Sequence, residues 1–187
     1  MARPIEYNKE DVLSKAMALF WEKGFESTSM KDLVEATGLT TRSMYNIFES
    51  KNGLFRASLE WYYEVSVKDR FEQLKTQTGL TAIRNFMNKL SSRRSENGCF
   101  FVNTASDKTN IDTLSFAIVE DYFKELEEVF KTQLEYAQKY EGYIHDPALR
   151  SKQLAIIIKG LSVQSKSDLE QNNLIVEDFL ILLDINK

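Results

Sequence analysis

Residues 29–54 read SMKDLVEATGLTTRSMYNIFESKNGL, and this stretch decides the fold of the N-terminal part of the chain. It contains two short helical patterns joined by a tight corner at Gly38, which is the outline of a helix-turn-helix. Ser29 can cap the first helix, with Asp32 reaching back as in a capping box. Glycine relieves the backbone at the corner, and either of the two threonines that follow can cap the second helix.

The second helix has two different faces. Stepping about 100° per residue places apolar side chains on one side and polar side chains on the other. The inward side consists of Met44, Ile47 and Phe48, and the outward side consists of Arg42, Tyr45 and Asn46. A guanidinium suits guanine or phosphate, a carboxamide can pair with adenine through two hydrogen bonds, and a phenol can reach a phosphate. The pattern predicts a base-reading helix, although an ordinary helical hairpin has the same spacing.

Residues 20–55 and their surroundings resemble the DNA-binding region of the tetracycline-repressor (TetR/AcrR) family of bacterial transcription regulators. The matching residues, in family order and spacing, are Ala16, Leu19, Phe20, Gly24, Thr28, Leu33, Ala36, Gly38, Tyr45, Phe48, Lys51 and Leu54. Two positions depart from the family, because Arg42 replaces a frequent glycine and Ile47 a frequent histidine. The predicted DNA-contacting residues are Thr28, Ser29, Thr40, Thr41, Arg42, Tyr45, Asn46 and Lys51.

The composition favours an all-α protein. The 187 residues are 43% hydrophobic and contain only two prolines and seven glycines, and no segment alternates as an exposed strand does. With the resemblance, this predicts an N-terminal three-helix bundle with the helix-turn-helix in residues 1–50, followed by a helical effector-binding and dimerisation domain in residues 51–187. Helices are expected over residues 8–23, 51–75, 81–95, 99–108, 113–140, 147–166 and 176–185.

The charge distribution is unusual for a DNA-binding protein. The formal net charge is −4, and residues 1–56 contain eight basic and eight acidic side chains. The acidic excess therefore lies in the C-terminal part. A neutral N-terminal part predicts modest nonspecific DNA affinity and a shallow salt dependence, because few counterions are released on binding.

The sequence also predicts where the protein works. It contains no apolar run long enough for a membrane span, and its first residues lack the apolar core of a secretory signal. The single cysteine excludes an internal disulfide and agrees with a reducing compartment. We expect a cytoplasmic protein that has no membrane partner.

The last two expected helices are apolar nearly all round. Such helices must be covered on several sides, either within one subunit or by a second copy of the chain. We interpret them as the interface of a homodimer formed by Ile156, Ile157, Gly160, Phe179 and Leu183. A twofold dimer would present two reading helices about one DNA turn apart, which predicts a pseudo-palindromic operator in double-stranded DNA.

The middle of the chain is rich in aromatic residues, most of which are expected to form an ordinary core. The family resemblance implies a ligand cavity within this region, for a small hydrophobic or aromatic effector. The residues predicted to line it are Trp61, Phe86, Cys99, Phe100, Asn103, Phe116, Tyr122 and Phe123.

Gly98 to Asn103 resembles a Gly-Cys-x-x-x-Asn element found in one branch of the family. Cys99 has two open roles. It is either a small buried filler or a thiol that reacts with electrophiles or oxidants, helped by Arg93 and Arg94 if these approach it.

Catalysis has little support in the sequence. The single histidine, His145, precedes Asp146 and Pro147 in an expected loop, and no HExxH, CxxC, GxSxG or phosphate-loop pattern occurs. We predict no catalytic residue, no metal site, no cofactor and no enzymatic activity. The predicted function is a sequence-specific repressor released by its effector. The alternatives are a nucleoid-associated protein without an effector pocket, a thiol-based sensor, and a helical carrier or enzyme whose helix-turn-helix does not bind DNA.

Overall fold

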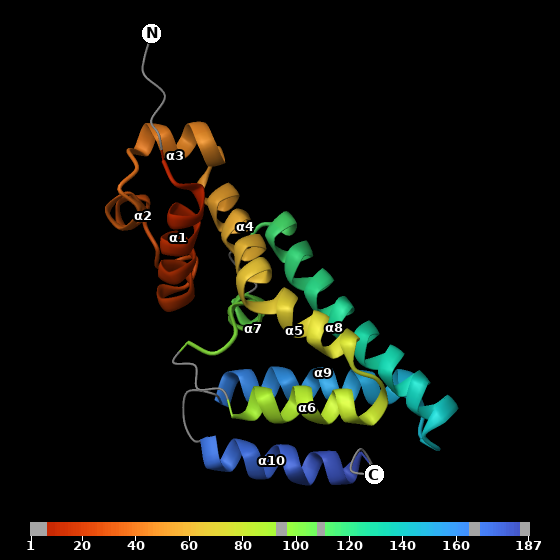
Figure 1. Ribbon diagram of the computed structural model, residues 1–187. Coiled ribbons are helices and arrows are strands. Elements are labelled where there is room, and N and C mark those ends of the chain that lie inside the picture. Colours follow the sequence, from red (N-terminus) through yellow and green to blue (C-terminus); the bar gives the residue numbers. More distant parts are fainter. Residues whose placement is uncertain (1–6, 93–96, 108–110, 165–168, 184–187) are drawn as a thin grey trace.

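A computed structural model of the chain describes residues 7–92, 97–107, 111–164 and 169–183. Within these residues all regular structure is helical, which confirms the all-α prediction (Figure 1). The elements are α1 (Lys9–Lys23), α2 (Met30–Thr37), α3 (Thr41–Phe48), α4 (Lys51–Tyr62), the π-helical turn η1 (Tyr63–Val67), α5 (Lys68–Thr76), α6 (Gly79–Ser91), α7 (Phe100–Ser106), α8 (Thr113–Tyr140), α9 (Pro147–Gln164) and α10 (Leu169–Leu182).

Helices α1, α2 and α3 form a compact head at one end of the molecule (Figure 1). Its interior is made of buried side chains from all three helices and from the start of α4: Val12, Ala16, Phe20, Leu33, Met44, Phe48, Leu54 and Phe55. Each helix of the head begins at a side-chain cap. Asn8 accepts hydrogen bonds from the first turn of α1, and Ser29 and Thr40 do the same for α2 and α3. The caps predicted from the sequence are therefore confirmed, with Thr40 rather than Thr41 capping α3.

A nearly continuous helical run leads from the head into the rest of the molecule. The expected single helix over residues 51–75 is α4, η1 and α5, in which a π-helical turn at Tyr63–Val67 separates two α-helical parts. α4 packs against α1 on one side and α8 on the other. The run therefore belongs to both the head and the body that follows it.

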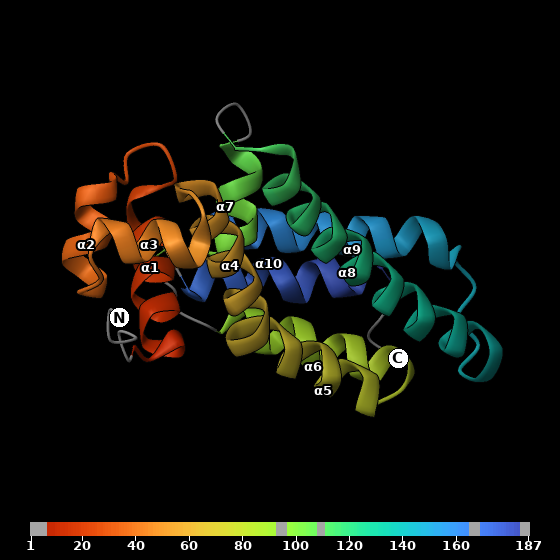
Figure 2. The same ribbon diagram turned by 90° about the horizontal axis from the view of Figure 1, so that it is seen from above.

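The body is built around the long helix α8, which lies beside α9 and contacts α4, α5, α6 and α7. Figures 1 and 2 show α6 lying between α5 and α10, and α6 also contacts α8. Along the described part of the chain, no helix combines the length and apolarity needed to cross a membrane.

Two helices begin earlier than the sequence pattern predicts. α6 begins at Gly79 because two groups distant in sequence accept hydrogen bonds from its first turn: Gln133 Oε1 from the Gly79 amide at 2.8 Å, and Glu141 Oε2 from the Leu80 amide at 2.9 Å. α10 begins at Leu169 rather than near residue 176, and it includes Asn172, whose side chain is buried. Hydrogen bonds from distant residues thus fix a start of α6 that the local sequence does not predict.

Candidate DNA interface and effector site

The outer face of α3 is the candidate reading surface. Thr41, Arg42, Tyr45 and Asn46 are exposed, with Tyr45 retaining 48% of its accessible surface. Ser43, Met44 and Phe48 are buried on the opposite side, and Ile47 is half-buried against the core. The assignment of the two faces from the helical wheel is confirmed. DNA contact by the four exposed side chains stays a prediction.

A capping box fixes the helix that precedes the reading helix. The Ser29 hydroxyl accepts a hydrogen bond from the Asp32 amide at 3.1 Å, and the Asp32 carboxylate accepts one from the Ser29 amide at 2.8 Å. The Ser29 hydroxyl and amide hold the pKa of Asp32 at about 2, below the usual 3.8. Gly38 then takes a left-handed conformation with φ of 73°, which turns the chain into α3.

The corner between α3 and α4 holds the reading helix in a strained, closely packed position. Glu49 has a φ of 66° and ψ of −39°, and the Ser50 amide donates to the Phe48 carbonyl at 2.7 Å, so the chain forms a tight γ-like turn. A Cβ atom placed on Gly53 would lie 1.9 Å from that same carbonyl oxygen. Sequence reasoning missed Glu49 and Gly53, because their roles depend on the contact between two helices.

Two predicted DNA-contacting residues, Thr28 and Lys51, are buried or half-buried in the head. Thr28 is a correction: its side chain is fully buried and its hydroxyl donates to the Gly24 carbonyl at 2.7 Å, so it is not part of the exposed surface. Lys51 is half-buried at the start of α4, with its ammonium 4.3 Å from the centre of the Phe25 ring. Burial lowers the pKa of Lys51, and the charge of Glu26 opposes that shift.

Polar contacts join the head to the body. Trp21 of α1 donates to the Asn97 carbonyl at 3.0 Å, and the Asn103 side chain donates to the same carbonyl at 2.7 Å. This carbonyl lies two residues before Cys99. Farther along the interface, Arg56 of α4 forms an ion pair with Asp112, the residue that caps α8. The loop containing Cys99 is therefore bonded directly to the head.

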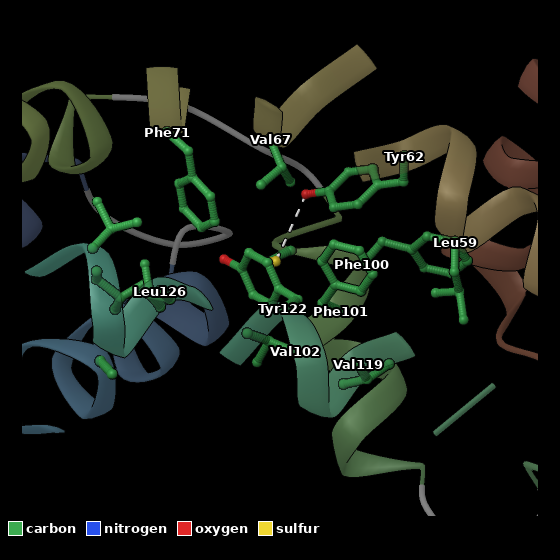
Figure 3. Close-up of a cluster of buried hydrophobic side chains, with 14 of the residues drawn as sticks. Leu59, Tyr62, Val67, Phe71, Phe100, Phe101, Val102, Val119, Tyr122 and Leu126 are labelled. Carbon is green, nitrogen blue, oxygen red and sulfur yellow. Dashed lines mark hydrogen bonds between the residues drawn. The ribbon is translucent and has the colours of Figure 1, made fainter. Parts of the chain in front are cut away.

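The predicted effector cavity is small in this conformation. A void of about 30 Å³ lies among α5, α6, α8, α9 and α10 and the segment around Cys99, enough for about one water molecule. Of the eight residues predicted to line an effector cavity, Phe86, Cys99 and Tyr122 line this void. The surrounding aromatic rings fill the region as a core (Figure 3), and Phe101 stacks on Tyr122 with 4.4 Å between ring centres.

The other five predicted ligand residues have different surroundings. Trp61 donates to the Ser14 hydroxyl of α1, Asn103 holds the Asn97 carbonyl, and Phe100 packs edge-on against Phe55. Phe116 is half-buried on α8, and the Lys159 ammonium lies 4.0 Å from the centre of the Phe123 ring. None of these five lines the void. Other residues line the void but were not predicted from the sequence. They come from segments far apart in the chain and include Arg70, Ser91, Leu161 and Asn172.

Cys99 lies in a tyrosine-rich environment. The Tyr62 hydroxyl donates to its sulfur at 3.7 Å, which is the dashed line in Figure 3. Burial raises the pKa of Tyr122, and its interaction with Cys99 adds to that effect. Arg70 is the cationic side chain among the described residues that line this void. Arg93 and Arg94, named from the sequence as helpers of the thiol, lie outside the described residues.

The outer faces of α9 and α10 expose large apolar side chains. Ile156 and Ile181 keep 65% and 63% of their accessible surface, and Val163 and Leu182 are also exposed. Of the predicted dimer residues, Ile156 and Gly160 are exposed, Ile157 and Phe179 are half-buried, and Leu183 is buried within the subunit. A single subunit leaves this apolar face uncovered.

Comparison with known proteins agrees with this architecture. Residues 12–58, which contain most of the head and the start of α4, match the family described as bacterial regulatory proteins, tetR family. The head of this chain is therefore similar to the tetR family. The transcriptional repressor ComR of Escherichia coli is 36% identical over 110 residues, which are 56% of this chain and 52% of ComR. The match thus spans about half the length of that relative.

Two further similarities extend beyond the head of the chain. The uncharacterised regulator YezE of Bacillus subtilis is 28% identical over 135 residues, which are 70% of each chain. The solved structure of the TetR family regulator CifR, a cysteine mutant complexed with a 26-base-pair double-strand operator, has a TM-score of 0.83 and 25% identity. The alignment covers 96% of this chain and 98% of CifR, so the fold of head and body together is shared.

Proposed function

We propose that this chain is a sequence-specific DNA-binding transcriptional regulator that acts as a repressor. The observation that carries the proposal is the exposed triad of Arg42, Tyr45 and Asn46 on a helix whose opposite face is buried in the head. A single helix with these donors and acceptors fits the major groove and can read guanine and adenine.

The remaining exposed residues of the head would contact the DNA backbone. Ser29, Thr40 and Thr41 lie at the starts of α2 and α3, where hydroxyls and free amides suit phosphate oxygens. Lys51 at the start of α4 adds a cation. Because the head has no net positive charge, these few contacts give a weak half-site, and specific binding then needs two heads.

The proposal includes a homodimer formed through α9 and α10. Their exposed apolar side chains, including Ile156 and Ile181, form a surface that a second copy would remove from water. Paired heads would bind a pseudo-palindromic operator. The division into a head at residues 1–50 and an effector-binding and dimerisation domain at residues 51–187 is part of this proposal, with α4 shared between them.

Release from DNA would follow from effector binding in the body. An effector weakens DNA binding only if it prefers a dimer whose heads are differently placed, and the two effects are then equal in free energy. The Trp21–Asn97 hydrogen bond and α4 are the direct connections through which the head would move. A regulator of this kind works on chromosomal DNA, so we place it in the cytoplasm and assign it no enzymatic activity or cofactor.

The test selects DNA from genomic fragments with purified full-length protein. The wild type should recover one or a few promoter regions, while the R42A/Y45A/N46A variant should recover none above background. A matched triple variant on the exposed far end of α8, Y136A/Q138A/Y140A, should recover the same promoters as the wild type. Many dispersed sites would instead support a nucleoid-associated protein, and no enrichment by the wild type would reject DNA regulation.

A second candidate function, a thiol-based electrophile sensor, is favoured by the surroundings of Cys99. The thiol lines the internal void beside Arg70 and accepts a hydrogen bond from Tyr62. In the proposed reaction the thiolate adds to the β-carbon of an enone. The carbon–sulfur bond forms, the carbon–carbon π bond breaks, and the resulting enolate takes a proton from water.

The enone reaction predicts a defined mass change and a change in DNA affinity. N-Ethylmaleimide should add once to the wild type and weaken operator binding at least tenfold, while the C99S variant should neither gain mass nor lose affinity. A Cys99 that stays unmodified at an excess of reagent, or a labelled protein with unchanged affinity, would reject the sensor role.

A further inference from the structure

A groove of about 440 Å³ lies between α5 and α6. Its lining includes buried Leu74 and half-buried Phe86 and Leu90, while Gln73 and Lys89 are exposed at its edge. The groove is more than ten times larger than the internal void around Cys99. A concave site of this size, with an apolar base and a few polar groups, suits a small organic molecule.

Two cations in the groove have neutral partners. Arg70 donates from its Nε to the Ser66 carbonyl, and Lys89 donates to the Gln73 side-chain oxygen. Within the described ranges neither is in an ion pair, and Asp69 is the single carboxylate among the lining residues. An anion placed between the two cations would replace hydrogen bonds to neutral acceptors by hydrogen bonds in which donor and acceptor are both charged.

The groove shares a wall with the internal void. Arg70, Phe86 and Leu90 line both spaces, and the void also contains Cys99 and Tyr122. The charge of Arg70 acts on Tyr62 and Tyr122, where it partly opposes the rise in pKa caused by burial. A ligand bound at Arg70 would therefore adjoin the segment whose Asn97 carbonyl is bonded to Trp21 of the head.

We infer that the α5–α6 groove binds a small organic anion, with its apolar body on Leu74, Phe86 and Leu90 and its charged group between Arg70 and Lys89. The inference rests on the proposed function, since it names the chemical class and the site of the effector. It also moves the effector from the filled aromatic core to the neighbouring groove.

Calorimetric titration of the full-length protein tests the site with three probes of equal chain length: octanoate, 1-octanol and octylamine. Octanoate should bind at least tenfold more tightly than the other two. Loss of one charged hydrogen-bond donor should weaken octanoate binding by about ten- to a hundredfold in R70Q and in K89Q. K68Q, on the same helix as Arg70 but in an exposed ion pair with Glu64, should bind octanoate like the wild type.

Since Lys89 is exposed, K89Q keeps the test valid if R70Q fails to fold. Equal binding of the three probes, no binding of octanoate, or wild-type binding of octanoate by K89Q would each overturn the site. Operator binding without any probe is measured on the same preparations. If operator binding is intact and octanoate does not bind, the site fails while the proposed function stands. If octanoate binds through Arg70 and Lys89 but no DNA fragment is selected, the proposed function fails while the site stands.

Discussion

The substitution G53A should disturb the reading helix from a position outside it. The new Cβ would lie 1.9 Å from the Phe48 carbonyl oxygen, whereas contacts under 3.0 Å essentially never occur. The two groups must therefore separate by about 1.1 Å, and because the obstacle is backbone, the end of α3 must move with it. Phe48 is the last residue of α3, so the displacement acts directly on the helix that carries Arg42 and Asn46.

The magnitude follows from two opposing effects. Replacing glycine by alanine inside a helix ordinarily stabilises by about 1 kcal/mol, while forcing extra volume into a packed site costs about 1–3 kcal/mol. We expect a net loss of up to about 2 kcal/mol, which lowers the melting temperature by up to about 8 °C in a chain of this length. Operator affinity should fall at least tenfold at a temperature where the variant is fully folded.

Thermal melting by circular dichroism and operator binding by fluorescence anisotropy measure these two effects. The matched control is N52A, because Asn52 lies in the same turn of α4 as Gly53. The Oδ1 atom of Asn52 is buried and has no hydrogen-bond partner among the described residues. It should melt at or slightly above the wild-type temperature and bind the operator normally. If G53A melts and binds like N52A, the close contact at the corner does not position α3.

E49G should raise the free energy of unfolding in denaturant by about 1 kcal/mol, because glycine adopts the positive φ at this position without strain. An equal gain in E49A would show that loss of the glutamate side chain, and not relief of backbone strain, stabilises the protein. The Asp32 carboxylate has a lowered folded-state pKa of about 2, so its contribution to stability is present above pH 4 and is lost as the pH falls towards 2. The D32N variant should therefore have a flatter stability–pH curve in this range. A curve parallel to that of the wild type would contradict this. I156E should convert the proposed dimer to a monomer in sedimentation at micromolar concentration, whereas I144E, exposed outside α9 and α10, should not. A dimeric I156E variant would exclude this face as the interface.

The head could be predicted from the sequence because its determinants are local. The capping box at Ser29, the glycine corner at Gly38 and the two faces of α3 each depend on residues within one or two helical turns, and all three are present. The family resemblance added the order of the helices. Thr28 was misplaced because a matching residue can serve packing as well as contact, and here its hydroxyl is used inside the head.

The effector region could not be predicted to the same extent because its determinants are distant in sequence. Gln133 and Glu141 accept the hydrogen bonds that begin α6, and neither can be assigned to that role from the sequence around α6. Aromatic periodicity cannot distinguish a lined cavity from a filled core, and packing of Phe101 on Tyr122 decides in favour of the core. The α5–α6 groove depends on how two helices lie against each other.

In the proposed function, Asn46 reads a base from the outer face of α3. The most direct measurement compares the wild type and N46A on a set of operators that differ by one base pair at each position of a half-site. We expect one A·T position at which substitution costs the wild type about 1–3 kcal/mol of binding free energy and costs N46A almost nothing, while all other positions behave alike. Equal losses for both proteins at every position would show that α3 does not read the operator through this side chain.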